Sequence, residues 1–169
     1  MLVNDFTQIN KEIMIDIAKS IKRLNIVTNH IEKFKKIQEY LYNEFGIMLN
    51  ISNNKKKSLL KSKIILNIDF PEELINKYNI HDNSIIININ EKIELKRKRF
   101  NGININDYRI EIPYEYKLKG FRNEIIYESL IYSKNYKIIK DKIKKDKIVI
   151  NKLIGNKGII AEQEIVKTR

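Results

Sequence analysis

The sequence predicts an α/β domain built on a doubly wound, mainly parallel sheet with helices on both faces. Short apolar segments alternate with amphipathic helical segments over the first two thirds of the chain. The isoleucine-rich runs at 64–66 and 85–87 are typical of strands that are buried on both sides. Right-handed crossovers between such strands lead to the doubly wound order.

Each expected element follows from a local pattern. Ile13, Ile17 and Ile21 are four residues apart, as on one face of a helix. Gly46 stands where a helix ends in a left-handed cap, and Pro71 stands in the first turn of another helix. In chain order, strands are expected over 1–6, 24–28, 47–51, 63–68 and 84–89, and helices over 10–22, 31–45, 55–62 and 71–78.

The pattern changes after residue 89. Alternating isoleucines over 103–112 predict one more strand, or an edge hairpin that turns near Asn101 and Gly102. A helix is expected over 121–140, followed by an extended run at 148–150 and a turn around Gly155 and Gly158. We expect residues 1–113 to form the main domain. Residues 114–169 then form a C-terminal helix and tail packed on the same domain.

Composition excludes several classes of protein. The chain has 169 residues and no cysteine, which rules out disulfides, thiolate catalysis and cysteine-ligated metal sites. No apolar run is long enough to span a bilayer, and the first residues do not resemble a signal peptide, so we expect a cytoplasmic protein without a membrane partner. The net charge of +12 indicates anionic partners. However, lysine, isoleucine and asparagine are all favoured by AT-rich codons, which weakens that indication.

Three segments carry a resemblance to a known family. They are LNIVTNH at the end of the second strand, the helix end EFGIMLNI, and KIILNIDFPEEL followed by SIIINI. The arrangement up to about residue 112 resembles the NAD(P)-binding Rossmann half of shikimate dehydrogenase and glutamyl-tRNA reductase. The resemblance implies that the second strand ends near an adenosine ribose. It also implies that the fourth strand ends beside the nicotinamide, at Asp69 and Pro71.

The glycine-rich loop of that family is degenerate here. The six positions after the first strand are 5–10, where Asp5, Thr7 and Asn10 replace the three glycines of G-x-G-x-x-G. Thr7 would crowd a pyrophosphate, and Asp5 would repel it by about 1 kcal/mol even in water. We therefore expect no bound cofactor. The alternatives are that Asn10 or Thr7 caps the following helix, or that the first strand lies elsewhere.

The end of the second strand carries Thr28, Asn29 and His30 instead of the acid that holds an NAD ribose. These residues would tolerate a 2′-phosphate, so any surviving site should prefer NADP. The preferred interpretation is a helix cap with a solvent-exposed histidine. His81 is the other histidine of the chain, and two distant histidines do not predict a metal site. For Asp69 and its neighbours, an ordinary helix start is the preferred interpretation.

Basic clusters near aromatic residues suggest a nucleic-acid surface as a further alternative. No recognised nucleic-acid-binding motif accompanies them, so solvated lysine faces are the preferred interpretation. The residues concerned are Lys55, Lys56, Lys57, Lys96, Arg97, Lys98 and Arg99.

The leading hypothesis is a Rossmann-like domain with a degraded dinucleotide loop that serves as a non-catalytic binding, regulatory or accessory protein. A protein partner or a homodimer fits that role. The first alternative is an NADP-dependent oxidoreductase that completes its site with a partner chain. The second is a nucleic-acid-binding protein that uses the lysine clusters.

Overall fold

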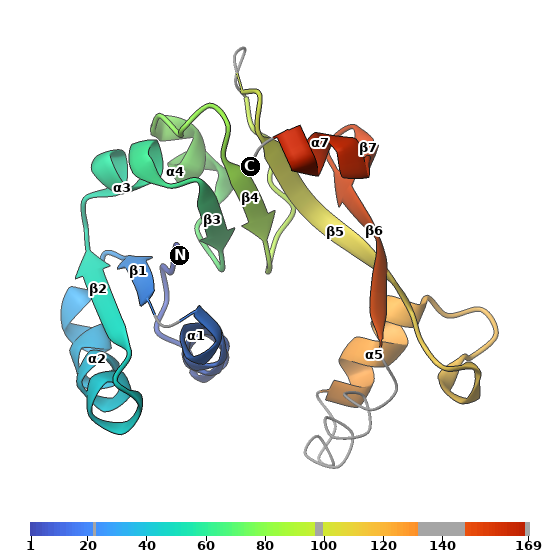
Figure 1. Cartoon of the computed structure of the whole chain (residues 1–169), viewed down its shortest axis with the longest axis horizontal. Helices are drawn as coiled ribbons and strands as arrows, with labels where there is room; N and C mark the ends of the chain where they lie inside the picture. The colour runs from blue at the N-terminus through green and yellow to red at the C-terminus, as the bar shows by residue number, and fades with distance from the viewer. Residues whose placement is uncertain (22, 97–99, 132–147, 168–169) are drawn as a thin grey trace.

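Helices and strands alternate along the first half of the chain, as the sequence predicts (Figure 1). A computed structural model describes residues 1–21, 23–96, 100–131 and 148–167. The bounds in chain order are α1 (Gln8–Ile21), β1 (Arg23–Val27), α2 (Ile31–Phe45), β2 (Met48–Ser52), α3 (Lys55–Lys61), β3 (Ile64–Asn67), α4 (Glu72–Lys77), β4 (Ile85–Asn88), β5 (Ile103–Glu111), the 3₁₀ turn η1 (Tyr114–Tyr116), α5 (Asn123–Ile131), β6 (Val149–Gly155), β7 (Gly158–Ile160) and α7 (Glu162–Lys167).

Local sequence explains where the helices run and stop. α2 buries Phe34, Ile37 and Leu41, which recur at helical spacing on one face. It ends at Gly46, whose φ of 62° lies in the left-handed region. The Gly46 N–H donates to the carbonyl of Tyr42 at 2.9 Å, so the predicted C-cap is confirmed. None of the helices in the described ranges is long and apolar enough to span a bilayer.

The strands form a mixed arrangement. β1 and β2 pair in parallel as a two-stranded sheet. In the five-stranded sheet, β3, β4 and β5 are parallel neighbours, and β6 and β7 continue it antiparallel to β5. The expectation of a mainly parallel sheet therefore holds only up to β5, because the tail folds back on β5 as an antiparallel ribbon.

The first residues of the chain connect the two sheets. Leu2 makes parallel bridges to Val27 of β1 and to Asn67 of β3. The Leu2 N–H donates to the carbonyl of Leu66 at 2.8 Å. The strand predicted over Met1–Phe6 is thus wrong in length, since only Leu2 bridges its neighbours, but the segment does lie between β1 and β3.

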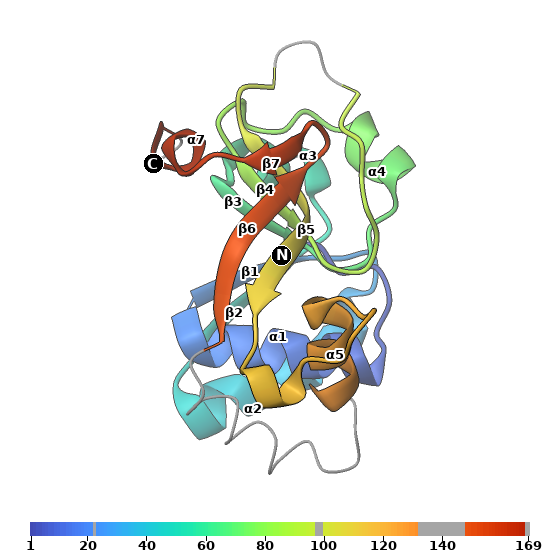
Figure 2. The ribbon, with the colours of Figure 1, turned by 90° about the vertical axis from the view of Figure 1, so that its right-hand side faces the viewer.

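Side chains on the two sides of this segment enter different cores. Val3 packs in a cluster to which α1 contributes Met14 and α2 contributes Phe34. Leu2 packs in a second cluster to which α3 contributes Leu59 and α4 contributes Ile75. Figures 1 and 2 both show α1 and α2 grouped together, apart from α3 and α4. Consecutive residues of an extended segment point to opposite faces, which accounts for this division.

The C-terminal part extends away from these cores (Figure 1). β5 pairs with β4 only over Ile103–Ile105, and beyond that point it pairs with β6. We call residues 106–131 and 148–155 the arm. A small cluster of Ile110, Ile112 and Ile126 packs α5 against one face of β5.

The elements predicted after residue 100 are largely present in the structure. Of the two readings near Asn101 and Gly102, the strand is confirmed and the hairpin is wrong, because Ile103 leads directly into β5 alongside β4. The extended run and the turn at Gly155 and Gly158 are confirmed as β6 and β7. The helix predicted over 121–140 is observed as α5, and its last residues lie outside the described ranges.

Candidate functional site

The side chain of Asp69 lies where the parallel strands end, against the loop that follows Val3. Its carboxylate accepts hydrogen bonds from the backbone N–H of Asn4 and from the backbone N–H of Asp5, the latter at 2.7 Å. It also accepts a bond from the side-chain amide of Asn10 at 2.8 Å. One carboxylate thus binds three donors of the loop and of the helix behind it.

The other loop residues have structural partners as well. Thr7 is the N-cap of α1, because its hydroxyl accepts a hydrogen bond from the backbone N–H of Asn10 at 3.1 Å. Asn10 is buried, and its amide donates both to Asp69 and to the carbonyl of Asp5 at 2.9 Å. Asp5 itself is exposed. The helix cap foreseen as an alternative role for Thr7 is therefore confirmed.

The hydrogen bonds from Asn4 and Asp5 to Asp69 direct backbone N–H dipoles at a negative charge. In a dinucleotide-binding loop, backbone N–H groups at the strand-to-helix turn point at the anionic pyrophosphate. Here the N–H groups of Asn4 and Asp5 point at an internal anion instead. A charged acceptor forms stronger hydrogen bonds than a neutral one, so the Asp69 carboxylate holds these two N–H groups firmly.

The end of β1 is occupied by a local turn. Thr28 is fully buried, and its hydroxyl accepts a hydrogen bond from the backbone N–H of His30 at 3.1 Å. His30 is the exposed N-cap residue of α2, and its side chain makes no capping hydrogen bond. Asn29 is exposed and accepts a hydrogen bond from the ammonium of Lys55. The geometry matches the helix-cap alternative for these residues.

Lys55 links the ends of two strands. It is the first residue of α3 and is only partly exposed. Besides its bond to Asn29, its ammonium lies 5.8 Å from the centre of the Phe70 ring, a cation–π distance. Sequence reasoning placed Lys55 in a basic cluster with Lys56 and Lys57, both of which are exposed. The structure instead places it beside the predicted cofactor residues.

Pro71 and its neighbours start a helix. Pro71 is the N-cap residue of α4, and the carboxylates of Glu72 and Glu73 follow in its first turn. Glu72 accepts hydrogen bonds from the backbone N–H of Glu94 and from Lys96, and these contacts hold the pKa of Glu72 below its usual value. Pro71 therefore has a helix-starting role in this structure.

A chain of asparagine side chains crosses the neighbouring strand ends. Asn67 donates to Asn88 at 3.1 Å, and Asn88 donates to Asn104 and to Asn106, each at 2.8 Å. Asn104 and Asn106 in turn donate to the carbonyl oxygen of the Asn156 side chain. These asparagine side chains link β3, β4 and β5 to the turn between β6 and β7. It is an internal network whose members serve as one another's partners.

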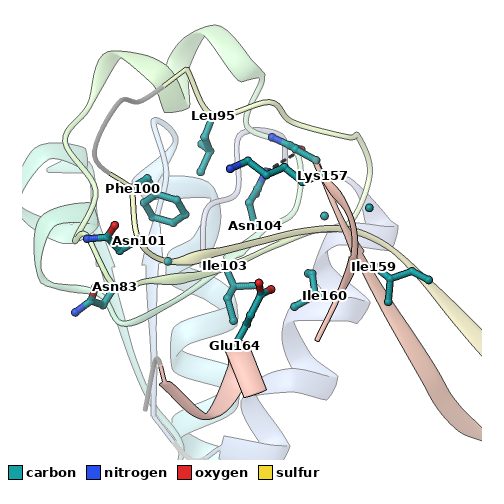
Figure 3. A pocket seen from close by; sticks show the side chains of 14 residues that line it. Asn83, Leu95, Phe100, Asn101, Ile103, Asn104, Lys157, Ile159, Ile160 and Glu164 are labelled. Atoms are coloured by element: carbon teal, nitrogen blue, oxygen red, sulfur yellow. Dashed lines mark hydrogen bonds between the residues drawn. The ribbon is translucent and has the colours of Figure 1, made fainter. Parts of the chain in front are cut away.

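A cavity of about 710 Å³ opens beside the outer end of this network (Figure 3). Phe100 and Leu95 lie on one side of it, and Ile160 and Glu164 lie on the other. None of the residues predicted to bind a cofactor lines this cavity. The cavity is thus separate from the Asp69 loop.

The remaining predicted residues do not form one site. Lys96 pairs with Glu72 at 3.2 Å, while Arg97, Lys98 and Arg99 lie outside the described residues. His81 accepts a hydrogen bond from the backbone N–H of Asn83 at 3.3 Å through its Nδ1. Among the described residues, no group of three or more His, Cys, Asp or Glu side chains is placed to hold a metal ion.

Sequence reasoning missed the contacts that matter most here. It named Asp69, Asn10 and Asp5 separately, without predicting that one carboxylate joins them. Asp69 and Asn4 are 65 residues apart, so no local pattern could reveal the contact. The asparagine network did leave a signal, because Asn67 and Asn88 each end an isoleucine-rich strand.

Comparisons with protein-family models, with curated proteins and with solved structures found no match to this chain.

Proposed function

We propose that this chain is a Rossmann-like domain whose dinucleotide site is closed by its own Asp69 carboxylate, and that it serves as a non-catalytic binding or accessory protein. The observation that carries the proposal is the set of hydrogen bonds from the backbone N–H groups of Asn4 and Asp5 to Asp69. Those donors are the ones that a nucleotide pyrophosphate would need.

The strand connections support the Rossmann-like part of the proposal. Following hydrogen-bonded neighbours, the spatial order is β2, β1, the Leu2 segment, β3, β4 and β5. If the Leu2 segment is counted as the first strand, this order agrees with the 3-2-1-4-5-6 order of the dinucleotide-binding fold. The division of α1 and α2 from α3 and α4 between two cores supports helices on both faces.

Energetics favour the closed loop over a bound cofactor. Hydrogen bonds to charged groups contribute about 1.5–3 kcal/mol each, and a pyrophosphate would have to replace two of them. It would also approach Asp69 and the exposed Asp5, and each of these negative charges opposes it. Since about 1.4 kcal/mol is a tenfold change in affinity, these terms together weaken dinucleotide binding by several orders of magnitude.

Thermal unfolding with and without nucleotide tests the proposal. A ligand at 100 times its dissociation constant adds about 2.7 kcal/mol to the stability of the folded state, which raises the Tm visibly. We expect no rise with millimolar NADPH, NADH or inorganic pyrophosphate at physiological salt. A saturable rise with NADPH in the unmodified protein would falsify the closed-site proposal.

A further inference from the structure

One face of the two-stranded sheet of β1 and β2 is exposed. Ile26 of β1 packs into the core with α1 and α2, whereas Arg23 and Asn25 are exposed. Their partners in β2, Met48 and Asn50, are exposed as well. Because successive strand side chains point to opposite faces, these four residues form one surface on the side away from α1 and α2. We call this surface the open face.

A hollow of about 330 Å³ lies between the open face and α3. The two strands contribute Asn25 and Asn50 to its lining, and α3 contributes Lys57 and Lys61. These lysines are four residues apart, so they lie on the same side of the helix. Ile64 of β3 also lines the hollow, with 68% of its surface exposed. Ammonium groups, side-chain amides and an exposed apolar group therefore share one surface.

The segments that build this hollow carry positive charge only. Its lining residues in the described part of the chain all belong to 1–4, 23–31 and 47–68. These segments together hold six Lys and Arg side chains and no Asp or Glu. Among the described residues, neither Lys57 nor Lys61 forms an ion pair with a carboxylate. Their charge is therefore available to an anionic partner.

Single-stranded nucleic acid complements the hollow in charge and in form. Its phosphates pair with ammonium groups, and its base edges and sugars bond to side-chain amides such as those of Asn25 and Asn50. A single strand is flexible and presents its bases beside its phosphates, whereas a duplex keeps its bases stacked inside. The described lining contains no aromatic side chain. We therefore expect binding to depend on phosphate contacts and little on base sequence.

We propose that the open face and α3 bind single-stranded nucleic acid, with Lys57 and Lys61 at its phosphates. Sequence reasoning placed Lys57 in a basic cluster with its neighbours in the chain. The structure instead joins it to Lys61 and to the asparagines of two strands. The proposal does not depend on the Asp69 loop, because none of the residues of that loop lines the hollow.

Fluorescence anisotropy of a labelled oligo(dT) strand of about 12 nucleotides tests the proposal with the full chain at physiological salt. The unmodified protein is expected to bind it saturably. Lys57→Glu combined with Lys61→Glu should weaken binding by about tenfold or more, because two phosphate contacts become repulsive. The dependence of log Kd on log salt should also become shallower by about 1 to 2.

Lys33→Glu combined with Lys36→Glu is the matched control. Both lysines are exposed on α2, which covers the other face of β1 and β2, and the change in net charge is the same. This control should weaken binding by less than about threefold, since long-range charge effects are screened at physiological salt. Circular dichroism checks that each variant is folded. If the Lys57 and Lys61 variant does not fold, glutamine replaces glutamate at both positions.

Three results would overturn the proposal. The first is that the unmodified protein shows no saturable binding at physiological salt. The second is that the α2 control weakens binding as much as the α3 variant, which would assign the binding to net charge alone. The third is that poly-glutamate or a duplex of the same length competes as well as unlabelled oligo(dT), which would assign the hollow to another class of polyanion.

Discussion

Asp69 has a structural role in the loop that precedes α1. Its carboxylate holds the backbone of Asn4 and Asp5 and the amide of Asn10, so it fixes the loop between the first segment and α1. In the proposed function, the same contacts occupy the donors that a phosphate would need. The proposal therefore assigns the closing of the site and the stabilising of the domain to one set of hydrogen bonds.

Replacing Asp69 should cost stability. Asp69→Ala leaves the donors of Asn4, Asp5 and Asn10 without their acceptor, and partly buried donors left unsatisfied cost about 1–3 kcal/mol. Urea unfolding measures the change. Asp82→Ala is the matched control, because Asp82 is exposed in a turn and should change stability by less than about 0.5 kcal/mol. Equal stability of the two variants would show that the Asp69 contacts are unimportant.

A second residue-scale prediction concerns acid stability of the arm. Burial opposes ionisation of Asp107, but the Tyr108 N–H and the guanidinium groups of Arg109 and Arg122 prevail and lower the pKa of Asp107. Because the folded pKa is the lower one, this stabilisation is present above the unfolded value of about 3.9. It is lost as the pH falls through the folded pKa.

Urea unfolding of the unmodified protein and of Asp107→Asn at a series of pH values checks this sign. We expect the unmodified protein to lose more stability than the variant as the pH falls below about 4, so that their difference shrinks in acid. If the free energies of unfolding of the two proteins differed by the same amount at every pH, the Asp107 ion pairs would contribute nothing to stability. Glu124, whose pKa Arg122 and the Ile110 N–H lower against the effect of burial, remains in both proteins as an internal reference.

At the scale of elements, the asparagine network fixes how β3, β4 and β5 meet at their carboxyl ends. Asn88 is central, because it accepts from Asn67 and donates to Asn104 and Asn106. It is buried, with 8% of its surface exposed. A fully connected buried network specifies one arrangement, whereas a partly connected one is costly.

Asn88→Ala should therefore destabilise the domain by about 1–3 kcal/mol, since it leaves buried amides without partners. Asn156→Ala provides the comparison, because Asn156 belongs to the same network but is exposed and can be replaced by water. Chemical denaturation measures the free energy of unfolding of both variants. If Asn156→Ala costs as much as Asn88→Ala, burial is not what makes the network important.

Elements were the most predictable part of the molecule. α2 follows from the spacing of Phe34, Ile37 and Leu41 and from the glycine at 46, which are local signals. The parallel pairing of β3 and β4 agrees with the expectation from their isoleucine runs. The expected burial on both faces is wrong for β3, because Ile65 is buried whereas Ile64 is 68% exposed. β6 and its antiparallel return could not be placed, because its pairing with β5 depends on contacts distant in sequence.

The candidate site was less predictable than the fold. The absence of glycines at 5–10 is visible in the sequence, and it directed attention to Asp5, Thr7 and Asn10. The group that occupies the loop comes from the end of another strand and is visible only once the Leu2 segment lies beside β3. Side chains that meet across strands are set by tertiary structure, which local patterns do not contain.

For the molecule as a whole, the Asp69 loop and the arm are distinct surfaces. The loop lies where the Leu2 segment joins β1 and β3, while the arm extends β5 and β6 away from both helix pairs (Figure 1). In the proposed function, the closed nucleotide site is the Asp69 loop and lies apart from the arm.

The most direct test of the central claim follows the backbone amide signals of Asn4 and Asp5 by NMR while NADPH is added to the unmodified protein. These are the two N–H groups that Asp69 holds. The account predicts that both signals stay in place up to millimolar NADPH at physiological salt. A saturable shift of both signals at micromolar NADPH would contradict it, because the cofactor would then occupy the loop that Asp69 is proposed to close.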